Sequence, residues 1–215
     1  MKKLFLAISA LAALSLLAPS AGVAQWADPM PRNQIGIYTT ATPTPEQAQD
    51  QASYTGEPGG NITAYVVCTN PWNEEPYTGE VRPITLIGGF EFHLYLPASV
   101  FLLGQTYPPA TTNFATPPDF YCGSAAPVTG NGTSVLVTLT LGEFNGTPGT
   151  ISIGPVTSLE PSRPGNMAIT DYNDDFSISL AYPSSGSYDL PVFGMYQGVM
   201  PSDDATWGGV KSLYR

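Results

Sequence analysis

The residues whose types and spacing favour chemistry are few, and the sharpest group is an acidic loop. Asp171, Asn173 and Asp175 stand at positions i, i+2 and i+4, the spacing of the first three oxygen ligands of a calcium loop. Phe176 stands where an EF-hand has glycine, and Tyr182 stands where it has a bidentate glutamate, which excludes that motif. A looser calcium site is one prediction; the alternative is an acidic, solvated turn, which Asp and Asn favour.

Aromatic residues near carboxylates form a second group. Trp72 and Tyr77 lie in a proline-containing segment with Glu74 and Glu75, and Tyr107 lies in another. Aromatic faces stack on sugar rings, so these three aromatic residues are candidates for carbohydrate binding; the alternative is that they fold onto the domain edge. Adjacent glutamates do not place two carboxyls across a glycosidic bond, so hydrolysis is not expected.

The single histidine, His93, lies on the polar side of a predicted strand with Glu91 and Tyr95. A catalytic triad needs a nucleophile within reach of the histidine. The sequence contains no G-x-S-x-G, no H-E-x-x-H and no phosphate-binding loop. The protein is therefore predicted to be non-enzymatic, with no cofactor beyond the calcium considered above.

The N-terminus predicts export. Two lysines precede the apolar run 4–18, and Gly22 and Ala24 are small residues at a cleavage site. This is the pattern of a Sec-type signal peptide, too short for a permanent membrane span. Residues 1–24 are therefore assigned to the signal, and the mature protein is expected to be secreted, in the periplasm or at the surface of a bacterial cell.

The net charge of the protein excludes some classes of binding partner. Loss of the signal leaves five basic against seventeen acidic residues, which is a net charge of −12. Nucleic acid and anionic membranes would repel such a protein, and no second long apolar run predicts a membrane span. Cys68 and Cys122 are the two cysteines, and in an exported chain they most simply form one disulfide. A redox or metal-binding pair is the alternative.

Alternating apolar and polar residues predict strands through most of the chain. The pattern is clearest in the segment 81–103, where one phase holds Ile84, Leu86, Phe90, Phe92, Leu94 and Leu96. A period of two places these side chains on one face of a strand, and Gly88 and Gly89 predict a bulge, because the phase does not change across them. Further strands are predicted at 35–39, 62–68, 134–141, 150–156, 167–171, 176–182 and 190–196.

A strand that is apolar on one face needs a second sheet to cover it. We therefore predict an all-β fold, an antiparallel two-sheet sandwich of eight to ten strands with jelly-roll or immunoglobulin-like topology. The segments 134–141 and 150–156 are predicted to form a hairpin, because Asn145-Gly146 is a typical turn.

These strands define one domain between a lead-in and a tail. Residues 25–60 are a lead-in with one strand and a Pro/Thr/Gln-rich linker, residues 61–196 are the sandwich, and residues 197–215 are the C-terminal tail. A short helix with Trp207 and Tyr214 on one side is predicted in the tail, and a final strand or an irregular end are the alternatives.

The phrase GFEFHL at 89–94 leads into a proline-bearing bend at 96–98 and then into a short apolar strand at 100–103. This order resembles a segment of cohesin-type and related secreted bacterial sandwiches, and the likeness extends over residues 60–156. It implies a jelly-roll-like or immunoglobulin-like, non-catalytic module. No residue matches a dockerin-binding face, so that partner is not implied. The ending 206–215 is similar to the ends of uncharacterised exported bacterial proteins.

Together these features predict a secreted, non-enzymatic β-sandwich that acts as a structural or protein-interaction module. Its expected partners are other surface or secreted proteins, or further copies of itself. The alternative is a carbohydrate-binding module for a polysaccharide, which would use Trp72, Tyr77 and Tyr107 and a supporting calcium ion.

Overall fold

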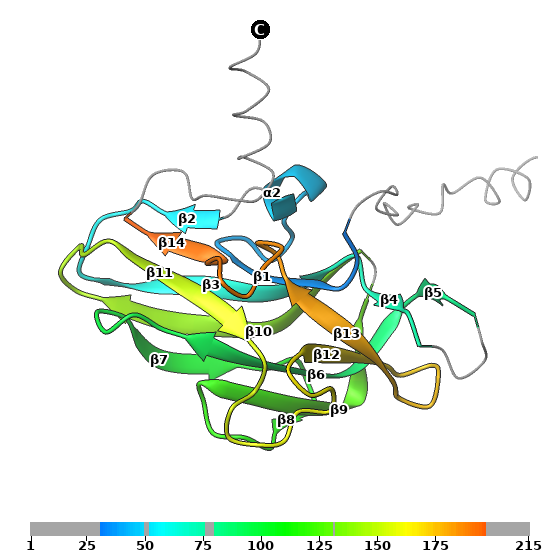
Figure 1. Cartoon of the computed structure of the whole chain (residues 1–215). Helices are drawn as coiled ribbons and strands as arrows, with labels where there is room; N and C mark the ends of the chain where they lie inside the picture. The colour runs from blue at the N-terminus through cyan, green and yellow to red at the C-terminus, as the bar shows by residue number, and fades with distance from the viewer. Residues whose placement is uncertain (1–30, 50–51, 76–79, 131, 197–215) are drawn as a thin grey trace, which may run out of the picture.

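The computed structural model describes residues 31–49, 52–75, 80–130 and 132–196. The predicted signal peptide, the C-terminal tail and Tyr77 lie outside these residues. Within them the protein is all-β, with one short helix, α2 (Pro45–Gln49) (Figure 1). Its strands are β1 (Gln34–Tyr38), β2 (Ala52–Tyr54), β3 (Gly60–Thr69), β4 (Trp72–Asn73), β5 (Arg82–Pro83), β6 (Leu86–Tyr95), β7 (Phe101–Thr106), β8 (Thr111–Asn113), β9 (Asp119–Thr129), β10 (Thr133–Glu143), β11 (Gly149–Gly154), β12 (Met167–Asp171), β13 (Ser177–Pro183) and β14 (Phe193–Met195).

Twelve of these strands form one mixed sheet. The order is β2-β14-β11-β6-β12-β13-β1-β3-β10-β7, with β9 paired to β6 and β8 paired to β9, while β4 and β5 form a separate hairpin. Eight to ten strands in two separate antiparallel sheets are predicted from the sequence, whereas the described residues form fourteen strands, and the hydrogen bonds of the mixed sheet run without a break. The reason is β1, since Gln34 and Ile35 pair parallel with β13 on one side and antiparallel with β3 on the other.

The sheet encloses one main core. Val66 and Leu139 come from β3 and β10, and Phe92 and Ile169 come from β6 and β12, yet all four belong to one contiguous buried cluster. Neighbouring strands are spaced by about 4.8 Å, so a flat sheet would hold these side chains far apart. The sheet therefore curls over on itself, and its apolar faces meet inside.

The central strand follows its prediction. Phe90, Phe92 and Leu94 of β6 are buried, as the alternation requires. The register between β6 and β9 shifts between Ile87 and Gly89, which confirms the predicted bulge. β9 and β12 flank this strand, so residues from three separate parts of the chain meet there.

The predicted hairpin of β10 and β11 is wrong. β10 pairs with β3 and β7, whereas β11 pairs with β6 and β14. The buried carboxylate of Glu143 explains the corner between them, because it accepts hydrogen bonds from the backbone N–H groups of Asn145, Gly146 and Thr147. These bonds fold the connection around the side chain, and the two strands separate instead of pairing.

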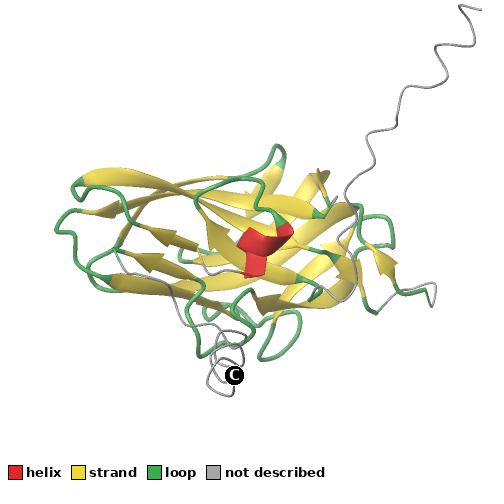
Figure 2. Cartoon of the chain, turned by 90° about the horizontal axis from the view of Figure 1, so that it is seen from above, coloured by secondary structure: helices red, strands yellow, loops and turns green. Residues whose placement is uncertain are grey.

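The helix α2 is not among the sequence predictions. Thr44 and Gln47 form a capping box: the Thr44 hydroxyl accepts from Gln47 N at 3.3 Å, and the Gln47 side chain accepts from Thr44 N at 2.9 Å. Ala48 packs against Tyr38 and Val67, so the helix lies over the sheet, as Figure 2 shows from above. Among the described residues no helix is long and apolar enough to cross a membrane.

Candidate functional site

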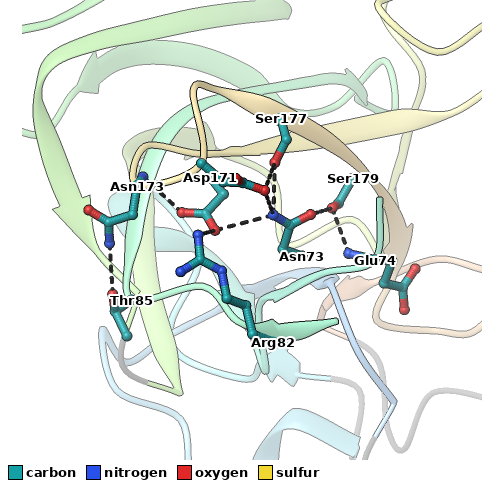
Figure 3. A network of polar contacts seen from close by, with 9 residues as sticks. Asn73, Glu74, Arg82, Thr85, Asp171, Asn173, Ser177 and Ser179 are labelled. Atoms are coloured by element: carbon teal, nitrogen blue, oxygen red, sulfur yellow. Dashed lines mark hydrogen bonds and ion pairs between the residues drawn. The ribbon is translucent and has the colours of Figure 1, made fainter. Parts of the chain in front are cut away.

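A buried polar network joins the β4–β5 hairpin to the predicted calcium loop (Figure 3). Asn73 Nδ2 donates to Asp174 Oδ2 and to Ser177 Oγ, each at 2.8 Å, and to Asp171 Oδ2 at 3.3 Å. Arg82 Nη2 lies 3.2 Å from the same Asp171 oxygen. Asn73, Asp171 and Asp174 are buried. Since carboxylates taken out of water need such partners, the network ties the loop firmly to the hairpin.

The network places the three predicted calcium ligands in different surroundings. Asp171 faces Arg82, and its Oδ1 accepts from Asn173 N at 2.9 Å. The Asn173 side chain donates to Thr85 Oγ1 at 3.0 Å, while Asp175 is exposed. In the described part of the chain no three Asp, Glu, His or Cys side chains form a metal-binding group. Calcium binding stays a prediction, and Asp171 has an arginine as its cationic partner.

The predicted sugar-binding aromatics are held by different elements. Trp72 belongs to β4; its indole Nε1 donates to Asn70 Oδ1 at 2.8 Å, and the Arg32 guanidinium lies 3.9 Å from the ring centroid. This cation–π contact covers one face of the indole. Tyr107 follows β7, and its hydroxyl accepts from Asn113 Nδ2 at 3.3 Å. Tyr107 lies in a groove.

The groove around Tyr107, here called the Tyr107 groove, has a volume of about 370 Å³. Hydroxyl groups and apolar surface share its lining, and none of the residues that form it carries a charge: Thr106, Tyr107, Pro108, Val128, Thr129, Thr133, Ser134, Val135 and Thr138. Burial raises the pKa of Tyr107, so its hydroxyl is protonated at neutral pH. Such a lining suits a neutral ligand that carries hydroxyl groups.

The predicted disulfide is wrong, because Cys68 and Cys122 are both free and buried. Cys68 lies on β3 opposite Ile35 and Ser134, whereas Cys122 lies on β9 opposite Phe90. The two strands do not pair with each other, and each thiol fills its own place in the core. Burial raises the pKa of both thiols to about 12, so they behave as small apolar side chains without nucleophilic reactivity.

The histidine on β6 has a carboxylate partner that the sequence does not indicate. His93 Nδ1 lies 2.7 Å from Asp119 Oδ1. Asp119 also accepts from Thr157 N at 2.8 Å, Thr157 Oγ1 at 3.0 Å and Ser158 N at 2.9 Å. Burial raises the pKa of Asp119, but hydrogen bonds from Ser158, Thr157 and His93 outweigh it and hold this pKa well below its usual value.

This arrangement does not have the order of a catalytic triad. In a triad the nucleophile and the carboxylate contact opposite nitrogens of the imidazole. Here Thr157 Oγ1 lies 3.3 Å from His93 Nδ1, the same nitrogen that faces Asp119. The group therefore positions the loop 155–166 and does not activate the Thr157 hydroxyl.

A second buried carboxylate, Glu91, fastens the same loop. It accepts from Ser162 N at 2.9 Å and from Ser162 Oγ at 2.9 Å. Glu91 and Asp119 thus bind the loop 155–166 to β6 and β9. The alternation of β6 places Glu91 and His93 on one face, but no local pattern shows which distant loop covers that face.

An exposed apolar patch lies at one end of the sheet order. Phe101, Leu103 and Phe144 have 53%, 50% and 52% of their surface exposed, and we call them the edge patch. The rings of Phe101 and Phe144 lie 6.3 Å apart, and a Cβ at Gly142 would lie 2.7 Å from Leu103 and 3.0 Å from Phe144. The three side chains therefore pack together over Gly142. No other described strand pairs with the second side of β7.

No model of a known protein family matches this chain, and no curated protein is similar to it. Among the described residues, the edge patch and the Tyr107 groove are two features that face solvent.

Proposed function

We propose that this protein is an exported, non-enzymatic β-sandwich that acts outside the cytoplasm as a structural or protein-interaction module, with a second copy of the chain as its partner. In this proposal the curled sheet works as two layers of jelly-roll or immunoglobulin-like type. β1, β3, β10 and β7 would form one layer, and β13, β12, β6, β9 and β8 the other. The shared core, in which Leu139 and Phe92 belong to one cluster, supports this description.

The edge patch is the observation that carries the proposal. An edge strand offers unpaired N–H and C=O groups to another chain, and proteins usually protect such edges with charges or prolines. β7 has neither, and between His93 and Asp119 the sequence contains no charged residue. The net charge of −12 that remains without the predicted signal opposes self-association over most of the surface. An uncharged, apolar edge is where two copies meet without that repulsion.

Two β7 strands related by a twofold axis would pair antiparallel and bring the two edge patches side by side on one face of the joined sheet. The register of β10 and β7 shifts between Thr140 and Leu141, so β7 contains a bulge. Bulges twist an edge and shorten the ladder that it can offer. A reversible dimer is therefore expected in place of a fibre.

Light scattering of the mature protein over a wide concentration range tests this proposal. The wild type should dimerise as its concentration rises, and Leu103→Glu should stay monomeric, because two carboxylates would face each other across the axis. Phe114→Glu introduces the same charge at another exposed apolar residue, outside the edge patch, and is the control, with thermal unfolding as the check on folding. A wild type that is monomeric throughout, or a Leu103→Glu variant that dimerises normally, would show that β7 is not an interface.

The second candidate is a carbohydrate-binding module, and the uncharged Tyr107 groove favours it. The ring of Tyr107 and the hydroxyls around it match the two surfaces of a sugar, its apolar faces and its polar rim. Titration with neutral oligosaccharides should show binding that Tyr107→Ala weakens. An unchanged affinity in this variant would exclude the Tyr107 groove as the site. The loop 171–175 would be the place of a supporting calcium ion.

A further inference from the structure

A second groove crosses four neighbouring strands. It has a volume of about 360 Å³ and is lined by residues of β8, β9, β6 and β12 and of the loop that follows β12. These strands are adjacent in that order, so the outer two are three strand spacings apart, roughly 14 Å. We call it the glycine groove, because its two central strands contribute Gly88, Gly89 and Gly123.

One row of paired residues defines the glycine groove. Thr112 of β8 pairs with Gly123 of β9, Gly123 pairs with Gly89 of β6, and Gly89 pairs with Thr170 of β12. Residues directly opposite each other in neighbouring strands share a face of the sheet. The row therefore has a hydroxyl at each end and no side chain in the middle.

Glycine is required on the central strands of this row. A Cβ at Gly89 would lie 2.8 Å from the Cys122 carbonyl oxygen and 3.1 Å from Thr170 Oγ1. The carbonyl belongs to the backbone and cannot move aside without disturbing β9. The open floor is thus a fixed property of this part of the sheet.

Two exposed phenyl rings form the walls. Phe114, two residues after Thr112, has 67% of its surface exposed, and Phe176, beyond β12, has 47% exposed. A Cβ at Gly123 would lie 3.3 Å from the ring of Phe114, and one at Gly88 would lie 2.6 Å from the ring of Phe176. The Phe114 ring therefore lies over Gly123, the Phe176 ring lies over Gly88, and both rings line the groove.

The buried network of Figure 3 holds one of these walls. Asp175 and Phe176 have φ values of +50° and +58°, a conformation that a bulky side chain rarely adopts. Such residues persist where their surroundings fix them. Here Ser177 N donates to Asp174 O at 2.9 Å, and Asn73 holds the Asp174 carboxylate. The network thus keeps Phe176 against the groove and not in the core.

Thr170 points to the chemistry of the ligand. Its Oγ1 is buried and has no hydrogen-bond partner within the described part of the chain, and it borders the groove. A buried hydroxyl without a partner is unfavourable, so a ligand that supplies one is favoured. None of the residues that line the glycine groove carries a charge. A charged ligand would therefore find no opposite charge there, whereas a neutral ligand needs none.

We propose that the glycine groove binds a neutral oligosaccharide. A pyranose ring has apolar C–H faces for the rings of Phe114 and Phe176, and its hydroxyl rim reaches Thr112 and Thr170. The open floor of glycines lets the sugar approach the backbone. This site rests on the carbohydrate-binding function proposed above and places that function on a different surface from the Tyr107 groove.

Calorimetric titration of the mature protein with cello-, xylo-, manno- and chito-oligosaccharides tests the site. Phe114→Ala and Thr170→Val should each weaken binding by about tenfold or more, as expected for the loss of a stacking contact or a hydrogen bond. Thr170→Val removes an unpartnered buried hydroxyl, so its thermal midpoint should not fall. A structural defect would lower both the midpoint and the affinity. Leu159→Ala, at an exposed apolar residue outside both the glycine groove and the edge patch, should bind as the wild type does.

The outcomes separate this site from the functions on which it rests. Binding that Tyr107→Ala abolishes and Phe114→Ala leaves unchanged would overturn the glycine groove and keep the carbohydrate-binding function. If none of the four sugars binds, both are overturned. Dimerisation through β7 is measured separately by light scattering, and its outcome does not depend on whether a sugar binds.

Discussion

The hydrogen bonds that converge on Asp119 make its replacement by asparagine the most informative perturbation of the fold. The carboxylate accepts four of them, from His93 Nδ1, Thr157 N, Thr157 Oγ1 and Ser158 N, at 2.7 to 3.0 Å. In Asp119→Asn an NH₂ group replaces one carboxylate oxygen. The hydrogen-bond donors that pointed at this oxygen then face another donor. A hydrogen bond to a charged group contributes about 1.5–3 kcal/mol. When these bonds are lost, part of the loop 155–166 can form hydrogen bonds with water instead, which reduces the total loss. We therefore expect a loss of about 2–3 kcal/mol in the free energy of unfolding, or roughly 4–12 °C in the thermal midpoint for a domain of this size.

The same residue predicts a pH dependence. Burial raises the pKa of Asp119, but the hydrogen bonds from Ser158, Thr157 and His93 hold it well below the unfolded value, which is about 3.9. A group with a lowered folded pKa stabilises fully above its unfolded pKa, and this stabilisation is lost as pH falls towards the folded pKa. At pH 3 the wild type should therefore have lost about 1 kcal/mol of this contribution. Solvent screening reduces this little, because the Asp119 side chain is only 5% exposed.

Urea unfolding followed by far-UV circular dichroism at pH 7 and pH 3 measures both effects. Asp189→Asn, at an exposed position, is the matched control and should change stability by less than about 0.5 kcal/mol. The gap between wild type and Asp119→Asn should narrow at pH 3, because the variant has no carboxylate to protonate there. A gap that is equally wide at both pH values, or a variant as stable as Asp189→Asn, would show that the Asp119 carboxylate does not hold the loop.

The remaining predictions concern the thiols, one glycine and calcium. Burial raises the pKa of the Cys68 and Cys122 thiols to about 12, so both should react with a thiol reagent only after unfolding. Dithiothreitol should leave the thermal midpoint unchanged; a lower midpoint on reduction would indicate a disulfide. Gly130→Ala should lower the free energy of unfolding by about 1–3 kcal/mol, because a Cβ there would overlap the Ile84 carbonyl oxygen. Gly60→Ala has open space around it and should be nearly neutral when both are measured by urea unfolding. If the loop 171–175 binds calcium, millimolar calcium should raise the midpoint, and Asp175→Asn should abolish the rise. An unchanged midpoint would show that Arg82 and Asn73 keep Asp171 from the ion.

The sequence by itself determined where many of the strands lie, although β8 and β9 are not among the predicted strands. The segments predicted at 62–68, 134–141 and 167–171 correspond to β3, β10 and β12. A strand beside a core must alternate its side chains, and that alternation is a local property with a period of two. The capping box of α2 is also local, and Thr44 and Gln47 in the sequence were a sufficient signal for it.

The candidate sites were predictable only in part. The acidic loop and Tyr107 are predictable from residue type, since Asp and Asn oxygens can bind calcium and aromatic faces can stack on sugars. The partner of the loop, Asn73, comes from a segment about a hundred residues earlier, and nothing in its neighbourhood indicates that partner. The glycines at 88 and 89 predicted a bulge, but not the open floor that they share with Gly123.

Only the tertiary structure decided which residues meet. Asp119 with His93, Glu91 with Ser162, and the row from Thr112 to Thr170 each join strands or loops that are distant in the chain. The path of the sheet was settled in the same way, since β1 links β3 to β13 and the corner at Glu143 separates β10 from β11. The physical reason is that alternation fixes which face of a strand is apolar. Its neighbour is fixed by the arrangement that buries the apolar faces together while leaving few buried polar groups without a partner.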